Sequence, residues 1–236
     1  MTNAPAIFCA LDRPDLDDAL ALARSLEGVV DGFKLGLEFV TANGPDGVRA
    51  VAALRSPVFL DLKFHDIPNT VAGAVEAARA LGIAMLTLHV SGGPEMLRVA
   101  VEAARAQAPC PKLIGVTVLT SLDDADLAAL GIAEKMPAHV ARLAGVAWDC
   151  GLDGIVCASH EVALLRSRFT PDFTLVVPGI RPSGSVAGDQ KRTMGPADAV
   201  AAGADVLVIG RPITEARDPR AAAQAIHAEI AAARAA

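Results

Sequence analysis

The sequence predicts a (β/α)8 TIM barrel that all 236 residues form as a single domain. Three observations predict it: eight short apolar runs of strand character, alanine-rich segments of helical periodicity between them, and near-continuous hydrophobicity within the runs. Barrels of this type commonly hold about 250 residues in one domain. Because no linker or composition shift divides the chain, we expect one domain over residues 1–236.

The predicted strands are spaced so that a helix fits between each pair. In order they are residues 7–11, 32–36, 58–63, 85–90, 113–118, 154–158, 174–179 and 206–210. Helical segments follow them, such as DLDDALALARSL after the first strand and EMLRVAVEAARAQ after the fourth. The tail after Asp218 is expected to be the closing helix. A doubly wound open sheet is the alternative, but its Gly-rich dinucleotide turn is replaced here by ALDRPD.

Composition narrows the classes of function. Hydrophobic residues make up 53% of the chain, yet no stretch reaches the roughly 18 apolar residues of a membrane span. The N-terminus lacks the basic and apolar regions of a secretory signal, so we expect a cytoplasmic protein. The net charge of −6, the 3% aromatic content and the lack of a basic run argue against nucleic acid as a partner. A small-molecule ligand is expected.

The four cysteines do not predict a metal or redox site. Cys9, Cys110, Cys150 and Cys157 are scattered and form no C-x-x-C pair. We expect reduced thiols and no metal ligands among them.

Charged residues gather at the carboxyl ends of the first three predicted strands, where barrel enzymes place their active sites. Asp12 follows the first strand, Lys34 lies late in the second, and Asp61 and Lys63 end the third. Side chains alternate along a strand, so Asp61 and Lys63 are expected on one face, with Lys34 beside them. An ordinary ion pair at the barrel end is the structural alternative. Asp66, three residues beyond Lys63, adds a further charge that such a pair does not need.

The last two strands are followed by a different signal. PGIRPSGSVAGDQKR after the seventh contains Arg181 and Gln190, and Gly210 with Arg211 follows the eighth. Loops in these places commonly bind phosphate through backbone N–H groups and guanidinium groups. A phosphorylated ligand is therefore expected, although both arginines could instead be solvated surface residues. The length and glycine content of residues 183–190 suggest a lid.

Several motifs together resemble the orotidine 5'-phosphate decarboxylase family in its stand-alone bacterial form. They are ALD at Asp12, FKLG at Lys34, DLKFHDIPNT from Asp61, TVLTS at 117–121, PGIRP at 178–182, GDQ ending at Gln190, and GR at 210–211. They cover nearly the whole chain in order. The resemblance implies decarboxylation of orotidine 5'-phosphate to UMP in pyrimidine biosynthesis, with no metal and no cofactor.

The resemblance also implies a role for each matching residue. Lys34, Asp61, Lys63 and Asp66 would form the catalytic array, with Lys63 protonating C6 of the pyrimidine and Asp61 lying against the departing carboxylate. Asp66 and Thr70 would be donated across the interface of a homodimer. Substrate-binding residues would be Asp12 and Lys34 at the ribose, Thr120 at the pyrimidine amide, and Arg181, Gln190, Gly210 and Arg211 at the phosphate.

Two other functions remain as alternatives. One is a magnesium-dependent sugar-phosphate decarboxylase or aldolase of the same superfamily, which shares the D-x-K-x-x-D spacing. Such enzymes place a carboxylate metal ligand where this chain has Lys34. The Lys34 ammonium would repel a magnesium ion at that position. A catalytically silent phosphate-binding barrel would need neither Asp61 nor Lys63. We expect His65 to have a packing role, or to support residues that contact the substrate, and not to act as an acid. The role of His89 is left open.

Overall fold

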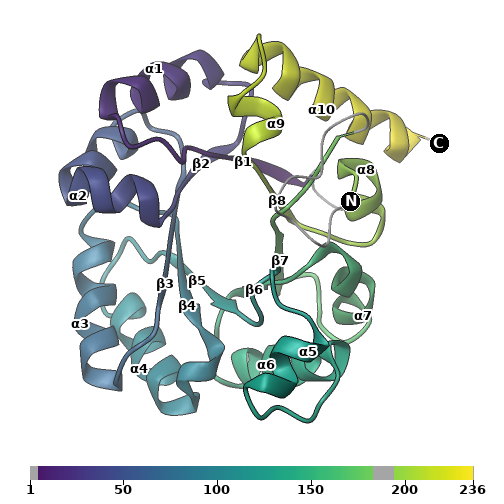
Figure 1. The fold of residues 1–236 in the computed structure, drawn as a ribbon. Coiled ribbons are helices and arrows are strands. Elements are labelled where there is room, and N and C mark those ends of the chain that lie inside the picture. Colours follow the sequence, from purple (N-terminus) through teal and green to yellow (C-terminus); the bar gives the residue numbers. More distant parts are fainter. Residues whose placement is uncertain (1–4, 183–193, 236) are drawn as a thin grey trace.

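The structure is a computed structural model that describes residues 5–182 and 194–235. Eight parallel strands close into a barrel in chain order, with β8 paired to β1 (Figure 1). The strands are β1 (Ala6–Ala10), β2 (Gly32–Leu35), β3 (Val58–Phe64), β4 (Met85–His89), β5 (Lys112–Val116), β6 (Gly154–Val156), β7 (Thr174–Val177) and β8 (Val206–Ile209). The predicted fold class is confirmed.

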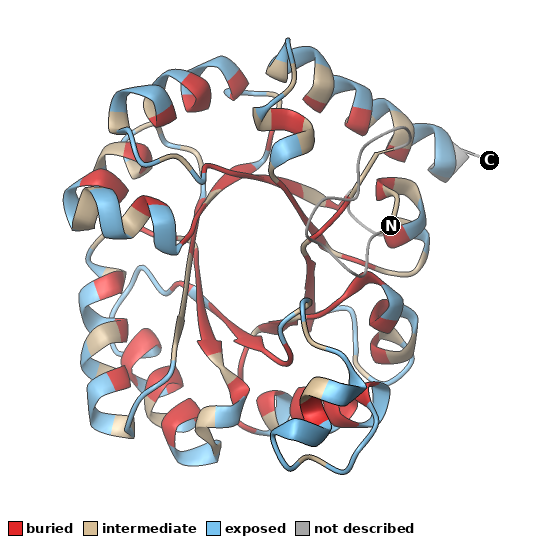
Figure 2. Ribbon diagram, in the orientation of Figure 1, coloured by how far each residue is buried: buried red, intermediate tan, exposed pale blue. Residues whose placement is uncertain are grey.

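Helices surround the barrel and bury one face each against it, while their outer faces are exposed (Figure 2). The main ones are α1 (Leu16–Leu26), α2 (Leu37–Ala52), α3 (Pro68–Arg79), α4 (Pro94–Arg105), α6 (Met136–Asp149), α7 (Val162–Arg166), α8 (Pro196–Ala201) and α10 (Pro219–Ala235). Shorter ones are η1 (Val90–Gly92), α5 (Asp124–Ala129), η2 (Ser159–Glu161) and α9 (Arg211–Thr214). The closing helix expected after Asp218 is α10.

Local sequence explains where several helices begin. A proline lies in the first two positions of α3, α4, α6 and α8, where its missing N–H costs no hydrogen bond. Asp15 caps α1 by accepting a hydrogen bond from the Asp18 amide at 2.9 Å. The predicted lid, residues 183–190, lies outside the described residues, as does Gln190. Its flanks are joined, because Ile180 and Met194 form a β-bridge.

Three strands end two residues earlier than the sequence predicts. The predicted strand 113–118 ends at Val116, the strand 154–158 at Val156, and the strand 174–179 at Val177. The last of these has a local reason. Pro178 has no N–H to donate to a ladder, and Gly179 adopts a positive φ of 74°, so the chain leaves the sheet there. The backbone beyond these strands is therefore free to line the barrel mouth.

An apolar cluster fills the barrel interior. It consists of Phe8, Ala10, Phe59, Met85, Ile114, Val176, Val206 and Val208, all buried. Phe8 and Phe59 meet edge to face at a centroid distance of 6.3 Å. Gly32 makes this possible, because a Cβ there would lie 2.4 Å from Cε1 of Phe8. The cluster forms a solid floor beneath the polar residues of the mouth.

Three aspartates anchor strands at the opposite end of the barrel. Each precedes an even-numbered strand and accepts a hydrogen bond from the backbone of the strand before it: Asp31 from Ile7 N at 2.7 Å, Asp153 from Leu113 N at 2.8 Å and Asp205 from Leu175 N at 2.7 Å. A glycine of positive φ, at Gly28, Gly151 and Gly203, precedes each aspartate by two or three residues. This recurring unit reverses the chain from helix to strand and fixes the strand starts.

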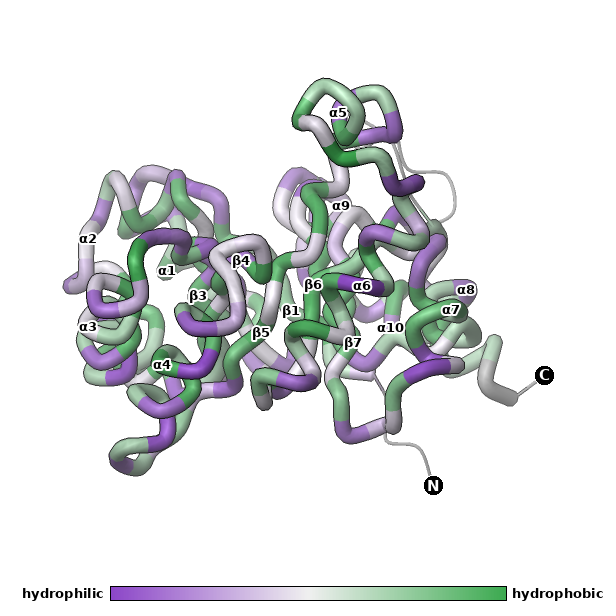
Figure 3. The backbone as a smooth tube through the Cα atoms, turned by 90° about the horizontal axis from the view of Figure 1, so that it is seen from below, coloured by the Kyte–Doolittle hydropathy of each residue, from purple (hydrophilic) through white to green (hydrophobic). Residues whose placement is uncertain are grey.

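Viewed from the side, α5 stands out from the barrel at the end where α9 also lies (Figure 3). Both follow the carboxyl ends of strands, so this is the barrel mouth. Among the described residues, no helix is long and apolar enough to cross a bilayer.

Asp205→Ala should lower the free energy of unfolding by about 1 to 3 kcal/mol, because it removes the acceptor of the Leu175 N–H and the ion-pair partner of Arg166. Urea denaturation measures the change. Asp172→Ala, at an exposed aspartate just before β7, is the control and should leave stability within about 0.5 kcal/mol. Equal stability of the two variants would contradict the anchoring role.

Candidate active site

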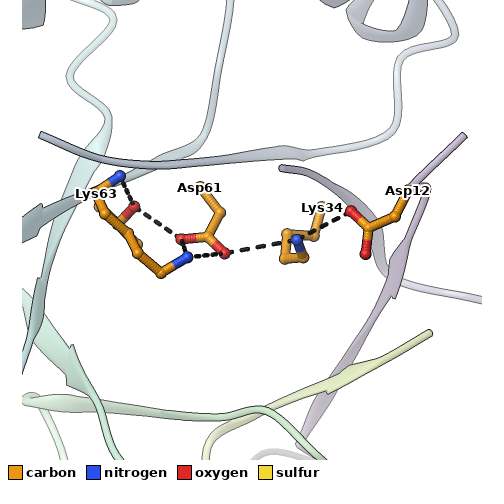
Figure 4. A network of polar contacts seen from close by, with 5 residues as sticks. Asp12, Lys34, Asp61 and Lys63 are labelled. Carbon is orange, nitrogen blue, oxygen red and sulfur yellow. Dashed lines mark hydrogen bonds and ion pairs between the residues drawn. The ribbon is translucent and has the colours of Figure 1, made fainter. Parts of the chain in front are cut away.

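Four charged side chains form a continuous row at the mouth of the barrel (Figure 4). The Lys34 ammonium lies 3.2 Å from Asp12 Oδ1 and 3.5 Å from Asp61 Oδ2. The Lys63 ammonium donates to both carboxylate oxygens of Asp61 at 2.9 Å. The structure thus brings together Asp12, Lys34, Asp61 and Lys63 in alternating sign, as the sequence predicts.

The row is set directly above the apolar floor by strand alternation. Lys34 comes two residues after Gly32 and Asp61 two residues after Phe59, so each points into the barrel one layer higher. Only 13% of the Lys34 and Asp61 side chains is exposed, against 46% for Asp12. These partly desolvated charges are compensated because each contacts a partner of opposite sign.

Alternation alone does not place Lys63. The pairing of β3 with β4 shifts in register between Leu60 and Phe64, and Lys63 has a left-handed backbone with φ of 53°. For a residue with a Cβ this conformation costs about 1 to 2 kcal/mol. The bulge turns the Lys63 ammonium back onto Asp61, so a strained residue lies at the centre of the site.

Thr87, which was not among the predicted site residues, holds this region together. Its side chain is fully buried in β4, accepts a hydrogen bond from the Lys63 backbone N–H at 2.8 Å and donates one to Asp61 Oδ1 at 2.9 Å. A signal was present: Thr87 lies between two leucines in an otherwise apolar strand, on the face that Met85 presents to the barrel interior.

The Asp61 carboxyl has a pKa below its usual range. Burial by itself would raise that pKa, but the ammonium groups of Lys34 and Lys63, together with hydrogen bonds from Lys63 and Thr87, outweigh it. Asp61 is therefore an anion at any pH near neutrality. A permanent negative charge thus lies within reach of a ligand in the mouth.

Gly36, after β2, is required by the row itself. A Cβ at this position would lie 2.7 Å from the Lys34 ammonium and 2.9 Å from Asp12 Oδ1. The glycine in the FKLG motif therefore leaves room for the contact between these two side chains.

The row forms one side of a cavity of about 530 Å3, a size suited to a small-molecule ligand. The predicted ligand-binding residues Thr120, Arg181, Gly210 and Arg211 line it, as do Asp12, Lys34, Asp61 and Lys63. Apolar walls come from the barrel floor, including Phe59 and Val176. One cavity thus joins the charged row to the loops after β7 and β8.

Arg181 and Arg211 converge on the side of the cavity opposite β3. Burial, and then the nearby Arg211 guanidinium, lower the pKa of Arg181, whereas the Glu215 carboxylate raises it. Two cations held this close favour a multiply charged anion between them. Glu215 and Glu38, which also line the cavity, were not predicted as site residues.

Asp66 and Thr70 lie apart from the cavity. Both are exposed, and Asp66 Oδ1 accepts a hydrogen bond from the Ile67 amide at 2.7 Å. The apolar side chain of Ile67 is 67% exposed and that of Leu37 58% exposed. Asp66 and Thr70 therefore do not line the cavity of their own barrel.

The two histidines near the row contact each other. The rings of His65 and His89 have centroids 5.4 Å apart. Burial, and then the charges of His65 and Lys63, lower the pKa of His89, so it is neutral at physiological pH. His65 itself is exposed and does not line the cavity.

The described residues show no group of three His, Cys, Asp or Glu side chains able to hold a metal ion. Burial raises the pKa of the Cys9 thiol to about 12, so it is unreactive. All four cysteines are free thiols.

Comparison with known proteins gives one consistent family. A model of the "Orotidine 5'-phosphate decarboxylase / HUMPS family" matches residues 5–226. The orotidine 5'-phosphate decarboxylase of Paramagnetospirillum magneticum is 52% identical over 229 residues, which cover 95% of this chain and 97% of that protein. The Rhodospirillum rubrum enzyme of the same name is 51% identical over 236 residues, covering 98% of this chain and 95% of that protein. A crystal structure of orotidine 5'-phosphate decarboxylase from Lactobacillus acidophilus aligns with a TM-score of 0.80 and 35% identity, over 97% of this chain and 99% of that one.

Lys34→Met should raise the pKa of Asp61, because it removes the first of the two ammonium groups that favour its ionised form. Carbon-13 NMR of carboxyl-labelled aspartate, with the Asp61 signal assigned from Asp61→Asn, measures the change. Lys135→Met, which breaks the exposed pair with Asp124, is the matched control and should leave Asp61 unchanged. An identical Asp61 titration in all three proteins would refute the electrostatic coupling.

Proposed function

The chain belongs to the orotidine 5'-phosphate decarboxylase / HUMPS family and decarboxylates orotidine 5'-phosphate to UMP in pyrimidine biosynthesis, and we propose that Lys63 protonates C6 of the pyrimidine in this reaction. The observation that carries the proposal is the row Asp12, Lys34, Asp61 and Lys63 at one side of a cavity whose other side bears Arg181 and Arg211.

The reaction needs a positive charge at one point. When the C6 carboxylate leaves as carbon dioxide, the electron pair of the broken bond stays on C6. It occupies an orbital that overlaps poorly with the π system of the ring, so the negative charge is not delocalised. The ammonium of Lys63, fixed in advance by Asp61, stabilises this developing anion. It then transfers a proton to C6, giving UMP, and recovers a proton from solvent. Neither a metal nor a cofactor enters this sequence.

Asp61 has a second effect, on the substrate carboxylate. Its low pKa keeps it ionised, so a substrate carboxylate bound beside it meets a like charge. The repulsion is relieved when that carboxylate becomes neutral carbon dioxide. This relief of repulsion lowers the barrier to decarboxylation, in addition to the stabilisation of the carbanion by Lys63.

The remaining cavity residues hold the substrate. Lys34 and Asp12, joined at 3.2 Å, bind the ribose hydroxyls, and Thr120 hydrogen-bonds the pyrimidine amide. The phosphate is held by Arg181, Gly210 and Arg211, which line the cavity. The family resemblance adds Gln190, which lies outside the described residues. Binding energy from this remote dianion helps to position C6 at Lys63.

The working enzyme is a cytoplasmic homodimer in which Asp66 and Thr70 complete the partner's site. Their exposure and their distance from the cavity lining of their own barrel support this arrangement. So do Ile67 and Leu37, because large exposed apolar side chains at the edge of the mouth favour burial against a second copy.

The assignment is tested by following the loss of orotidine 5'-phosphate absorbance with EDTA present throughout. Conversion to UMP at full rate in EDTA supports a metal-independent decarboxylase. Activity only on a sugar phosphate, and only after magnesium is restored, would favour the magnesium-dependent alternative. The ammonium of Lys34 beside Asp61 argues against that alternative, because it occupies the space a cation would need.

Lys63→Ala should lower kcat by about 1,000-fold or more, since it removes both the proton donor and the charge at C6. Calorimetry should show that UMP still binds. Lys112→Ala, at the start of β5 and the opposite end of the barrel, is the matched control and should keep wild-type kinetics. Substantial turnover by the Lys63 variant would remove it as proton donor.

Mixing inactive Asp66→Asn and Asp12→Asn proteins should restore about one quarter of the wild-type activity, because half of the dimers are hybrids with one intact site of two. Steady-state assay after subunit exchange measures the recovery. A mixture of Asp12→Asn with Lys63→Ala is the control, since both changes lie in the protomer's own part of the site and no hybrid has an intact site. Equal failure of both mixtures would mean that sites are not shared.

A further inference from the structure

Thr87 connects the two members of the catalytic pair through a single oxygen atom. Its hydroxyl donates to the Asp61 carboxylate at 2.9 Å and accepts from the Lys63 backbone N–H at 2.8 Å. The hydroxyl therefore uses its one proton and a lone pair on the two neighbours that matter most to the site. The residue is fully buried and is not among those that line the cavity, so it reaches substrate only through these neighbours.

The Lys63 backbone needs such a partner. Its φ of 53° and the shift in register between Leu60 and Phe64 take it out of the regular ladder between β3 and β4. The Lys63 N–H is thus held by a side chain of β4 in place of a strand carbonyl. A hydrogen bond at this position fixes the direction in which the Lys63 side chain leaves the strand.

We propose that Thr87 is a positioning residue for decarboxylation, which fixes the backbone of Lys63 and the carboxylate of Asp61 in one geometry before substrate binds. The inference rests on the proposed roles of Lys63 and Asp61. Preorganisation of this kind acts on the chemical step, because the ammonium must already lie where charge develops at C6. Ground-state binding of the nucleotide depends on the ribose and phosphate contacts, in which Thr87 takes no part, and is little changed.

The site requires the hydroxyl of Thr87, and not the volume of its side chain. A valine fills nearly the same volume, but it leaves the Lys63 N–H without its acceptor and Asp61 with one hydrogen bond fewer. A serine keeps both hydrogen bonds and loses only a methyl group. The two substitutions therefore separate the hydroxyl from the packing.

Loss of the Thr87 hydroxyl should also change how kcat depends on pH in the acidic range. The charged and titratable groups around Asp61 are Lys34 on β2, Lys63 on β3 and His89 on β4. These remain in Thr87→Val, whereas the hydroxyl that favours the ionised carboxylate is lost, so the pKa of Asp61 rises. The acidic limb of kcat should move to higher pH in this variant.

The test compares Thr87→Val and Thr87→Ser in the intact enzyme. Thr87→Val should lower kcat on the order of 10- to 100-fold with KM for orotidine 5'-phosphate nearly unchanged, and Thr87→Ser should restore most of kcat. Thr174→Val is the matched control, since it removes another buried strand threonine hydroxyl at the opposite end of the barrel. It should keep the wild-type kcat and pH profile even if its Tm falls.

The outcomes separate this inference from the proposed function. Loss of activity in Lys63→Ala and Asp61→Asn with wild-type kcat in a folded Thr87→Val would overturn the positioning role alone. So would a Thr87→Ser variant as impaired in kcat as Thr87→Val, because packing would then be the cause. Full activity in Lys63→Ala would instead overturn the catalytic assignment on which the role depends. If Thr87→Val does not fold, Thr87→Ser decides the question. A wild-type kcat and a wild-type pH profile in Thr87→Ser support the role of the hydroxyl, and a lowered kcat overturns it.

Discussion

The mutual compensation of four charges in a partly dry barrel mouth is the constraint on which the rest of this site depends. Asp61 is nearly buried and contacts two ammonium groups, and Lys34 in turn contacts Asp12. Removing one member of such a row leaves its neighbours with uncompensated charge, which in buried pairs costs about 3 to 5 kcal/mol. Each member therefore supports the position of its neighbours, and the contacts of the row are present before substrate binds.

The barrel supplies the rigidity that this arrangement requires. An apolar floor that includes Phe8, Phe59 and Met85 fills the interior directly below the charges, and Gly32 allows Phe8 to pack against the neighbouring strand. At the far end, Asp31, Asp153 and Asp205 fix the starts of three strands. Because β3 is packed into this floor through Phe59, its carboxyl end can carry a strained residue such as Lys63.

The proposed catalytic pair and the proposed phosphate-binding residues lie on opposite sides of one cavity. The residues proposed to act at C6 belong to β3 and β4, whereas the residues proposed to bind the phosphate follow β7 and β8, which face them across the mouth (Figure 1). This separation allows binding energy from the phosphate to be used for orientation at C6 without altering the charges around it. It also explains why Thr87, which contacts neither ribose nor phosphate residues in the structure, is expected to act on kcat.

The sequence by itself determined the fold class, the closing helix and the residues of the charged row, because strand periodicity and the position of polar residues at strand ends are local patterns. It predicted the proximity of Asp61 and Lys63 from alternation, although the bulge at Lys63 shows that alternation is only part of the reason. Only the tertiary structure revealed Thr87 and the space that Gly36 leaves for Lys34 and Asp12. These features arise from contacts between neighbouring strands and loops, and such contacts depend on the register and curvature of the closed barrel, which no local pattern of residues specifies.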